Sequence, residues 1–265
     1  IGIPEKIVSG TTQITKSPDR LLIAELTASF LEKSGLLRNG ATMQAGAGGT
    51  SLAIAVFVHQ MLKKKGWKLS FGFGGSTKYM VDMLEEGQMG AILDAQAFDL
   101  DSVQSIEKNL NHIPYPVFNA YNYHSKGNLT TMMDIMILGA TEIDTNFNGN
   151  VVTHSDGLLL HGIGGWQNCL HARNVIIPVP LFRDRIPVIV DRVTTLCGPG
   201  ELIDVIITER GIAINPRRED LIEAVRGKGL PLVTIEELKE TAEKICGKPE
   251  KAAFDDRVVA AIKWV

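Results

Sequence analysis

Residues 42–66 read TMQAGAGGTSLAIAVFVHQMLKKKG, which joins a short strand-like run, a glycine turn and a long apolar segment. The turn is Gly46-Ala47-Gly48-Gly49, and the apolar run over residues 52–62 has the length of a buried helix. Glycine lets a ligand approach the main chain, and a helix start presents unpaired N–H groups with a partial positive charge. The segment therefore predicts a strand–turn–helix unit that binds an anion or oxyanion.

Two more segments share this composition. Gly72-Phe73-Gly74-Gly75 is expected as a turn before a helix that begins at Ser76, and Gly162-Ile163-Gly164-Gly165 as a turn before Trp166. Any one of the three is as consistent with tight helix packing as with binding, but their recurrence indicates several edges of one pocket. The first two segments, GAGGTS and GFGGST, lack the lysine of a phosphate-binding loop and the third glycine of a dinucleotide fingerprint, so a main-chain oxyanion hole or thioester cradle is favoured over nucleotide chemistry.

Strands and helices alternate through the first half of the chain, which is typical of a mostly parallel sheet with helices on its faces. The sequence predicts strands over residues 41–45, 67–73 and 89–95 and helices over residues 18–34, 50–66, 76–86 and 99–110.

The second half is more irregular. Residues 112–127, HIPYPVFNAYNYHSKG, contain two prolines and no helical period, so we expect a long loop, a feature that is often functional. Further strands are expected at residues 135–138, 175–179, 187–190 and 204–208, a hairpin over 143–152, and helices at 216–226, at 235–246 with a capping box, and near residue 264. Because no Pro-, Gly- or Ser-rich linker divides the chain, residues 1–265 are interpreted as one domain.

Composition narrows the class of protein. The 265 residues are 45% hydrophobic with a net charge of −3, which gives no electrostatic basis for binding nucleic acid or an anionic membrane. The three cysteines match no metal or disulfide spacing, so reduced thiols, a cytoplasmic location and no metal site are expected. No apolar run has the length of a membrane span. The first residue is Ile1 rather than Met, so we expect a piece of a longer chain.

Three charged or polar clusters are candidates for ligand binding. His154-Ser155-Asp156 holds the residue types of a catalytic triad, but neighbours on a strand point to opposite faces, so a turn in which Ser155 and Asp156 make hydrogen bonds is favoured. Glu209-Arg210 and Asp191-Arg192 follow predicted strands, where open sheets bind ligands, although a surface ion pair explains each equally well.

Several stretches carry a family resemblance. MQAGAGGTSLAIAVFV and HGIGGWQN resemble the glycine motifs of a class of CoA transferases that includes acetyl-CoA hydrolases and hydroxybutyrate CoA transferases. More specifically, the chain is similar over almost its whole length to the α subunits of citrate lyases. The matching stretches are QAGAGGTSLAIAVF, FGFGGSTKYMVDMLE, ILDAQAFDLDSV and IPVIVDRVTTLCGPGELIDVIITERGIAINPRR.

The resemblance implies an α/β, NagB/RpiA/CoA transferase-like fold and a citrate:acetyl-acyl-carrier-protein transferase (citrate CoA-transferase) activity. The substrate would be the thioester of CoA-like phosphopantetheine on a carrier protein, or of CoA, with no covalently bound cofactor. The family's α subunit is about twice this length, so the chain looks like its C-terminal half. The implied partners are the N-terminal half, the acyl carrier protein and the lyase β subunit in an oligomeric complex.

The wider transferases place a glutamate nucleophile on the strand after the first glycine turn, whereas residues 69–73, LSFGF, contain no carboxylate. The resemblance then implies direct attack of citrate on the acetyl thioester through a mixed anhydride, a route that needs positioning and oxyanion stabilisation. Arg192 or Arg210 would hold the carboxylates that do not react. The alternatives are a general short-chain CoA transferase or acyl-CoA hydrolase, and a non-catalytic ligand-binding regulatory domain of the same fold.

The motifs and the resemblance together predict two sets of site residues. The catalytic set is Gly46, Ala47, Gly48, Gly49, Gly74 and Gly75. The set that binds substrate or thioester is Gln44, Thr50, Gly72, Phe73, Ser76, Ser155, Asp156, Gly162, Gly164, Gly165, Arg192, Glu209 and Arg210.

Overall fold

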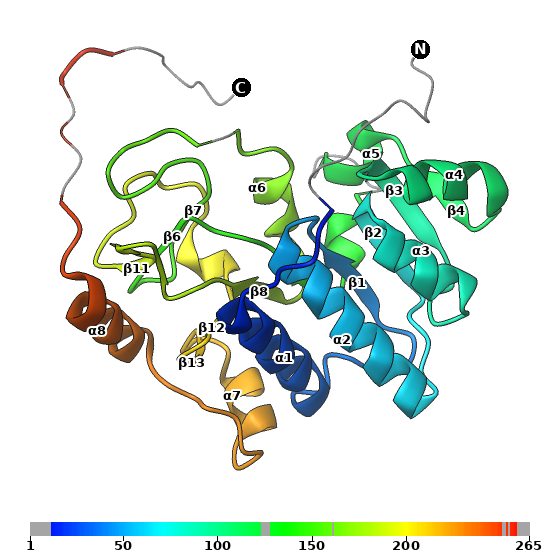
Figure 1. Ribbon diagram of the computed structural model, residues 1–265, viewed down its shortest axis with the longest axis horizontal. Coiled ribbons are helices and arrows are strands. Elements are labelled where there is room, and N and C mark those ends of the chain that lie inside the picture. The colour runs from blue at the N-terminus through cyan, green and yellow to red at the C-terminus, as the bar shows by residue number, and fades with distance from the viewer. Residues whose placement is uncertain (1–11, 123–127, 161, 251–252, 254, 259–265) are drawn as a thin grey trace.

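A computed structural model describes residues 12–122, 128–160, 162–250, 253 and 255–258 (Figure 1). Its centre is an eight-stranded sheet with the order β13-β12-β8-β5-β1-β2-β3-β4, in which every neighbouring pair is parallel except β12 and β13. The strands are β1 (Thr42–Ala45), β2 (Phe71–Ser76), β3 (Ile92–Ala97), β4 (His112–Pro114), β5 (Ile135–Ile137), β8 (Val175–Pro178), β12 (Val205–Thr208) and β13 (Gly211–Ile214).

One face of the sheet is covered by helices α1 (Pro18–Lys33), α2 (Gly49–Lys65), α3 (Lys78–Glu85) and α7 (Glu219–Val225). Figure 1 shows α1 and α2 side by side in front of the strands. Successive residues of a strand point to opposite faces, and Ile135 and Ile137 accordingly pack into the core beneath these helices.

Met136, between them, points into a second core on the other face. That face carries a small sheet of β11 (Ile189–Val190), β6 (Glu142–Asp144) and β7 (Gly149–Asn150), together with the helices α5 (Val117–Tyr121), α6 (Trp166–Cys169) and α8 (Ile235–Cys246). Helix α4 (Leu100–Lys108) joins β3 to β4, and β9 (Phe182–Arg183) pairs with β10 (Ile186–Pro187). The α/β class, the mostly parallel sheet and helices on both faces are thus confirmed. None of the helices in the described ranges has the length and apolar character needed to cross a membrane.

Several local predictions are confirmed. Gly66 ends α2 in the left-handed conformation, and Thr234 and Glu237 form the expected capping box of α8. Asp99 caps α4 by accepting a hydrogen bond from the Ser102 amide. The hairpin at residues 143–152 forms with shorter strands, β6 and β7. The helix expected near residue 264 lies outside the described residues.

The second glycine segment is a strand, not a turn, so that prediction was wrong. Residues Phe71–Ser76 form β2 between β1 and β3, and α3 begins only at Lys78. Glycine is needed in this strand because side chains from neighbouring elements fill its Cβ positions. A Cβ on Gly72 would lie 2.5 Å from the Met80 side chain, and one on Gly75 would overlap the Phe98 ring.

Two other predictions need correction. Residues 112–122 are not a loop, because they contain β4 and α5, with Pro116 at the N-cap of α5; residues 123–127 lie outside the described part. The strand expected at 187–190 is divided between β10 and β11, and β11 pairs with β6 in the small sheet instead of extending the central one. The parallel strands β8 and β12 do extend the central sheet.

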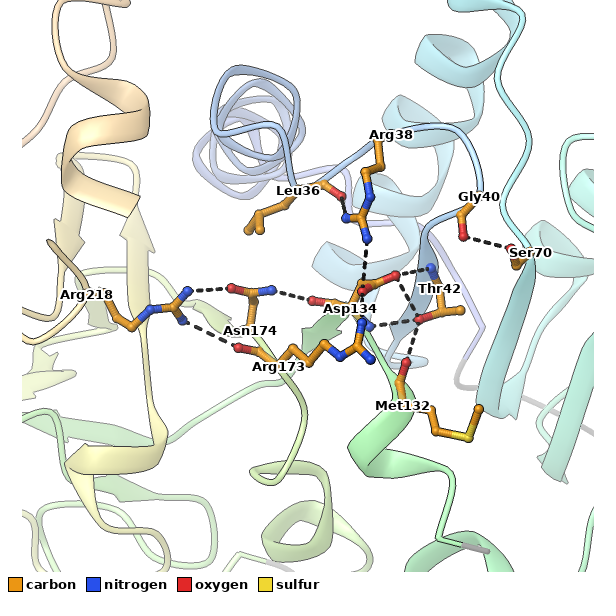
Figure 2. A network of polar contacts seen from close by, with 10 residues as sticks. All are labelled: Leu36, Arg38, Gly40, Thr42, Ser70, Met132, Asp134, Arg173, Asn174 and Arg218. Carbon is orange, nitrogen blue, oxygen red and sulfur yellow. Dashed lines mark hydrogen bonds and ion pairs between the residues drawn. The ribbon is translucent and has the colours of Figure 1, made fainter. Parts of the chain in front are cut away.

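A polar network around Asp134 lies at the end of the central sheet where the parallel strands begin (Figure 2). Its carboxylate accepts hydrogen bonds from the Thr42 amide at 3.0 Å, from Arg173 at 3.0 Å and from Arg38 at 3.2 Å. Burial raises the pKa of Asp134, but the Thr42 amide and the two arginines outweigh it and hold the pKa below its usual range. These groups join the starts of β1, β5 and β8, and open α/β sheets bind ligands at the opposite end, beyond the carboxyl ends of their strands.

Candidate active site

Gln44 connects the first two glycine segments. It lies in β1, just before Gly46, and its side chain is 8% exposed, with Oε1 buried and lacking a hydrogen-bond partner in the described structure. The Cγ of Gln44 is 3.1 Å from the position that a Cβ on Gly74 would occupy, and Gly74 has a φ of +100° that favours glycine. The amide of Gln44 is therefore a polar group held at the junction of the two segments.

Tyr121 connects the second segment to the third. Its hydroxyl is 3.6 Å from the Cβ position of Gly74, and its ring atoms are 3.1–3.3 Å from that of Gly165. The ring also packs against Phe73, with centroids 5.5 Å apart. Asn168 donates a hydrogen bond of 2.6 Å to the Tyr121 carbonyl and so attaches α6 to α5. The second and third glycine segments thus meet around one tyrosine, and Gln44, which precedes the first segment, packs against Gly74 beside it.

Sequence reasoning did not identify Tyr121 or Asn168 as site residues. Both lay in stretches that had been singled out, Tyr121 in the tyrosine-rich residues 112–127 and Asn168 in HGIGGWQN. Burial, followed by the nearby Cys169 and Asp94, raises the pKa of Tyr121 above its usual value. The phenol is therefore held neutral, the state in which it donates a hydrogen bond.

The first glycine turn presents the start of α2. Gly48 is the N-cap and has no side chain to bond the first-turn amides, which also lack intrahelical acceptors. Gly49 is covered by residues 13–15: a Cβ there would lie 3.0 Å from Thr15 N, and the Thr15 amide donates to the Gly49 carbonyl at 3.2 Å. The turn thus presents backbone amides at the start of α2, and residues 13–15, which precede α1, pack over it.

Ser76, predicted to bind substrate, is the last residue of β2 and is fully buried. Its hydroxyl donates to Asp94 at 2.9 Å, and Asp94 is also 3.3 Å from His112 Nε2. The other His112 nitrogen is 2.8 Å from the Ser105 hydroxyl. This arrangement resembles a triad in residue types, but all four side chains are buried and bonded to one another, so their evident role is to fix β2, β3 and β4 next to Tyr121.

Ser155, Asp156 and Arg192 lie outside the junction around Tyr121. The Ser155 hydroxyl donates to the buried Glu142 at 2.5 Å, and Asp156 accepts from the Leu158 amide at 3.0 Å, so the predicted hydrogen-bonded turn is confirmed. Arg192 is exposed and lines a cavity of about 400 Å³ with Glu142, Ser155 and Lys248. None of the three is brought to the junction around Tyr121.

Glu209 and Arg210 follow β12, as expected, but Glu209 bonds a neighbouring segment of the same chain. The Glu209 carboxylate accepts from the Leu181 amide at 3.0 Å, which holds the segment leading into β9. Arg210 is exposed, with its Nε 4.0 Å from Glu209.

The three glycines of the third segment differ in their surroundings. Gly162 lines an apolar cavity of about 530 Å³, Gly164 has a left-handed φ of +57°, and Gly165 contacts Tyr121.

In the ranges that the structure describes, no group of three or more His, Cys, Asp or Glu side chains is arranged to hold a metal ion. Burial raises the pKa of Cys169, close to Tyr121, to about 12, so its thiol is neutral near pH 7 and a poor nucleophile.

Comparison with known proteins identifies the family of this chain. The family model for the citrate lyase alpha subunit (CitF) matches residues 1–265. The chain belongs to the citrate lyase alpha subunit family. Among curated proteins it is 41% identical to the citrate lyase alpha chain of Klebsiella pneumoniae and 40% identical to that of Escherichia coli (strain K12), over 265 residues in each case. Both matches cover 100% of this chain and 52% of the relative, so the chain spans about half the length of these relatives.

Solved structures agree. A citrate lyase alpha subunit from Streptococcus mutans, crystallised in complex with citrate, superposes with a TM-score of 0.95 at 42% identity, over 100% of this chain and 52% of that one. The malonate decarboxylase alpha subunit from Acinetobacter baumannii gives a TM-score of 0.58 at 16% identity, over 85% of this chain and 50% of that one, and shows a shared fold only.

Proposed function

We propose that this chain is the C-terminal half of a longer subunit that exchanges acetate for citrate on the thioester of an acyl carrier protein. Family membership and the citrate-bound relative support the choice of substrate. The observation that carries the proposal is the junction of Gln44, Gly74, Gly165 and Tyr121, where a buried amide oxygen has no partner in the described structure. A buried polar atom without a partner is costly, and a ligand can supply what it lacks.

The reaction has two balanced steps. A citrate carboxylate attacks the acetyl carbon, the carbon–sulfur bond breaks, and a mixed anhydride and a thiolate result. The thiolate then attacks the citryl carbonyl of the anhydride, which forms the citryl thioester and releases acetate. The attacking carboxylate is already ionised and the thiolate is a good leaving group, so the protein has to position the reactants and stabilise the oxyanion at each addition.

The residues at the junction and the amides at the start of α2 suit those two tasks. The first-turn amides of α2 around Gly49 and the neutral Tyr121 hydroxyl are hydrogen-bond donors for a developing oxyanion. The Gln44 amide, with both a donor and an acceptor, would orient the thioester arm, whose pantetheine portion carries amide groups. β2, which follows the first glycine turn, contains no carboxylate among Phe71–Ser76, which supports a route without a glutamyl intermediate.

The wider setting is part of the same proposal. The remaining half of the subunit, the carrier protein and a lyase β subunit would complete an oligomeric, cytoplasmic complex. The chain itself would bind no covalent cofactor and would act on the phosphopantetheine thioester that the carrier brings, or on CoA.

The test is a transfer assay with the full-length subunit, acetyl-carrier protein and citrate, read by mass spectrometry of the carrier. We expect the acetyl thioester to be replaced by a citryl thioester. Malonate or succinate in place of citrate tests for a general CoA transferase, and omission of the acid tests for a hydrolase. Equal turnover with any short acid, hydrolysis alone, or citrate binding without turnover would each contradict the proposal.

A further inference from the structure

A cavity of about 740 Å³ brings together two arginines that are far apart in sequence. Arg20 comes from the first turn of α1 and Arg183 from β9, and His154 contributes a third polar side chain. The lining is completed by Ser17, Asp19, Leu160, Pro180, Phe182 and Asp184. Sequence reasoning did not single out either arginine.

Among the described residues, neither guanidinium group has a carboxylate counterion. One terminal nitrogen of Arg183 donates to the Ala140 carbonyl at 2.6 Å, while its Nε is buried and has no hydrogen-bond partner among the described residues. Burial lowers the pKa of Arg183, and the positive charge of Arg20 lowers it further, so the two groups repel each other across the cavity. Although Asp19 and Asp184 line the same cavity, no carboxylate of the described residues lies within 4.0 Å of either arginine.

A ligand that carries several carboxylates would relieve this repulsion. Guanidinium groups present a planar fork of donors that matches a carboxylate, and two of them can hold two carboxylates of one small acid. The amino-terminal end of α1 carries a partial positive charge, which also favours an anion but more weakly. Ser17, at its N-cap, makes no side-chain hydrogen bond to the first-turn amides.

The cavity lies beside two glycine segments. The chain that covers Gly49 continues directly into the start of α1, since the Ser17 amide bonds the Thr15 hydroxyl and the Thr15 amide bonds Gly49. On the other side, Ala140 anchors Arg183, and the adjacent Gly139 carbonyl accepts a hydrogen bond of 2.8 Å from Trp166, which follows Gly165. Two independent chains of hydrogen bonds therefore link the segments that carry the arginines to the first and third glycine segments.

We propose that this cavity binds the di- or tricarboxylic acid that accepts the thioester, with Arg20 and Arg183 pairing with the carboxylates that do not react. This assignment rests on the proposed transfer for its substrate, and it replaces Arg192 and Arg210 as the expected clamp. Glu209 then has a positioning role, because its bond to Leu181 fixes the segment that carries Arg183.

The test measures binding and kinetics separately in the full-length subunit. Arg20→Gln and Arg183→Gln each remove one charge, and Arg183→Lys keeps the charge but loses the fork. Arg185→Gln is the matched control, since Arg185 is exposed on the same hairpin and faces Cys246. Calorimetric titration uses citrate and tricarballylate, which has three carboxylates but no hydroxyl. Arg20 is exposed, so its variant is not expected to disturb folding even if Arg183→Gln does.

We expect the dissociation constants of both acids to rise at least tenfold in Arg20→Gln and Arg183→Gln, and to stay unchanged in Arg185→Gln. The KM for the acetyl thioester should stay near the wild-type value. Unchanged binding of both acids in Arg20→Gln would overturn the inference, and so would a raised KM for the thioester alone, which would assign the arginines to a phosphate of the carrier arm. A subunit that binds tricarboxylates through these arginines but transfers nothing would refute the proposed function and leave this site standing.

Discussion

The Tyr121 hydroxyl is the side-chain donor that the proposed chemistry depends on most. Tyr121→Phe keeps the ring that packs on Phe73 and Gly165 and removes only the hydroxyl. We expect kcat/KM for citrate transfer to fall by about 100-fold, as for the loss of one oxyanion donor, with little change in thermal stability. Tyr79→Phe on α3, at the edge of the other core, is the control and should leave the rate unchanged. A Tyr121→Phe rate within twofold of wild type would remove the hydroxyl from the mechanism.

Gly74 tests whether the backbone geometry of β2 matters. An alanine there is strained by its φ of +100° and would press on Gln44 Cγ at 3.1 Å. We expect Gly74→Ala to lower the free energy of unfolding by about 1–3 kcal/mol and the transfer rate by about tenfold or more.

Gly87→Ala provides the comparison, because Gly87 has a φ of +85° with open space around it at the end of α3. It should show a similar loss of stability in urea unfolding and full transfer activity. If both variants lose activity equally, the effect belongs to folding and not to the site.

At the scale of secondary-structure elements, Asp134 joins three strands at the edge opposite the site. Its pKa is depressed in the folded state, so its contribution to stability is present above the unfolded pKa of about 3.9 and is lost as pH falls through the folded value. We expect Asp134→Asn to lower the free energy of unfolding by about 2 kcal/mol at pH 7, with the difference from wild type shrinking below about pH 4.

Urea unfolding between pH 3 and 7 measures this difference. Glu223→Gln removes one partner of an exposed ion pair with Arg226 on α7 and should change stability by less than about 0.5 kcal/mol at any pH. A constant Asp134→Asn difference across the whole range would show that the carboxylate charge is not the stabilising feature.

Elements with a strong local signal could be predicted from the sequence. Caps and periodic apolar residues located α1, α2 and α8 closely, because capping and helix periodicity act within a few residues. β2 was misjudged because its glycines are required by Met80, Met89 and Phe98, which reach it only in the folded chain. β4 and α5 were missed for a related reason, since their short segments owe their structure to pairing with β3 and packing against α6.

The candidate site, too, was predictable from sequence only where the signal is local. Glycine composition identified all three segments, and Gln44, Gly74 and Gly165 do lie together. Arg192, Glu209 and Arg210 were chosen because they follow strands, but that position alone does not tell which way a side chain points. Arg20 and Arg183 are ordinary in sequence and become notable only when tertiary structure places them in one cavity.

On the scale of the whole molecule, the two ends of the parallel strands carry different groups. The amino edge is closed by the Asp134 network, whereas the carboxyl side carries the glycine segments, the Tyr121 junction and the arginine cavity. This asymmetry matches the general rule that open α/β sheets bind ligands beyond the carboxyl ends of their strands. The account therefore places thioester and acid on the same side of the sheet.

The most direct test of that account follows oxygen through a single turnover. The full-length subunit, in excess over its acetyl-carrier thioester, is mixed with citrate labelled with ¹⁸O in every carboxylate, and the released acetate is analysed by mass spectrometry. Direct attack through a mixed anhydride transfers one citrate oxygen to the acetyl group, so each acetate molecule should carry one ¹⁸O atom. Unlabelled acetate in that first turnover would show that an oxygen of the protein or of water attacks the acetyl group instead of citrate, and would contradict the account.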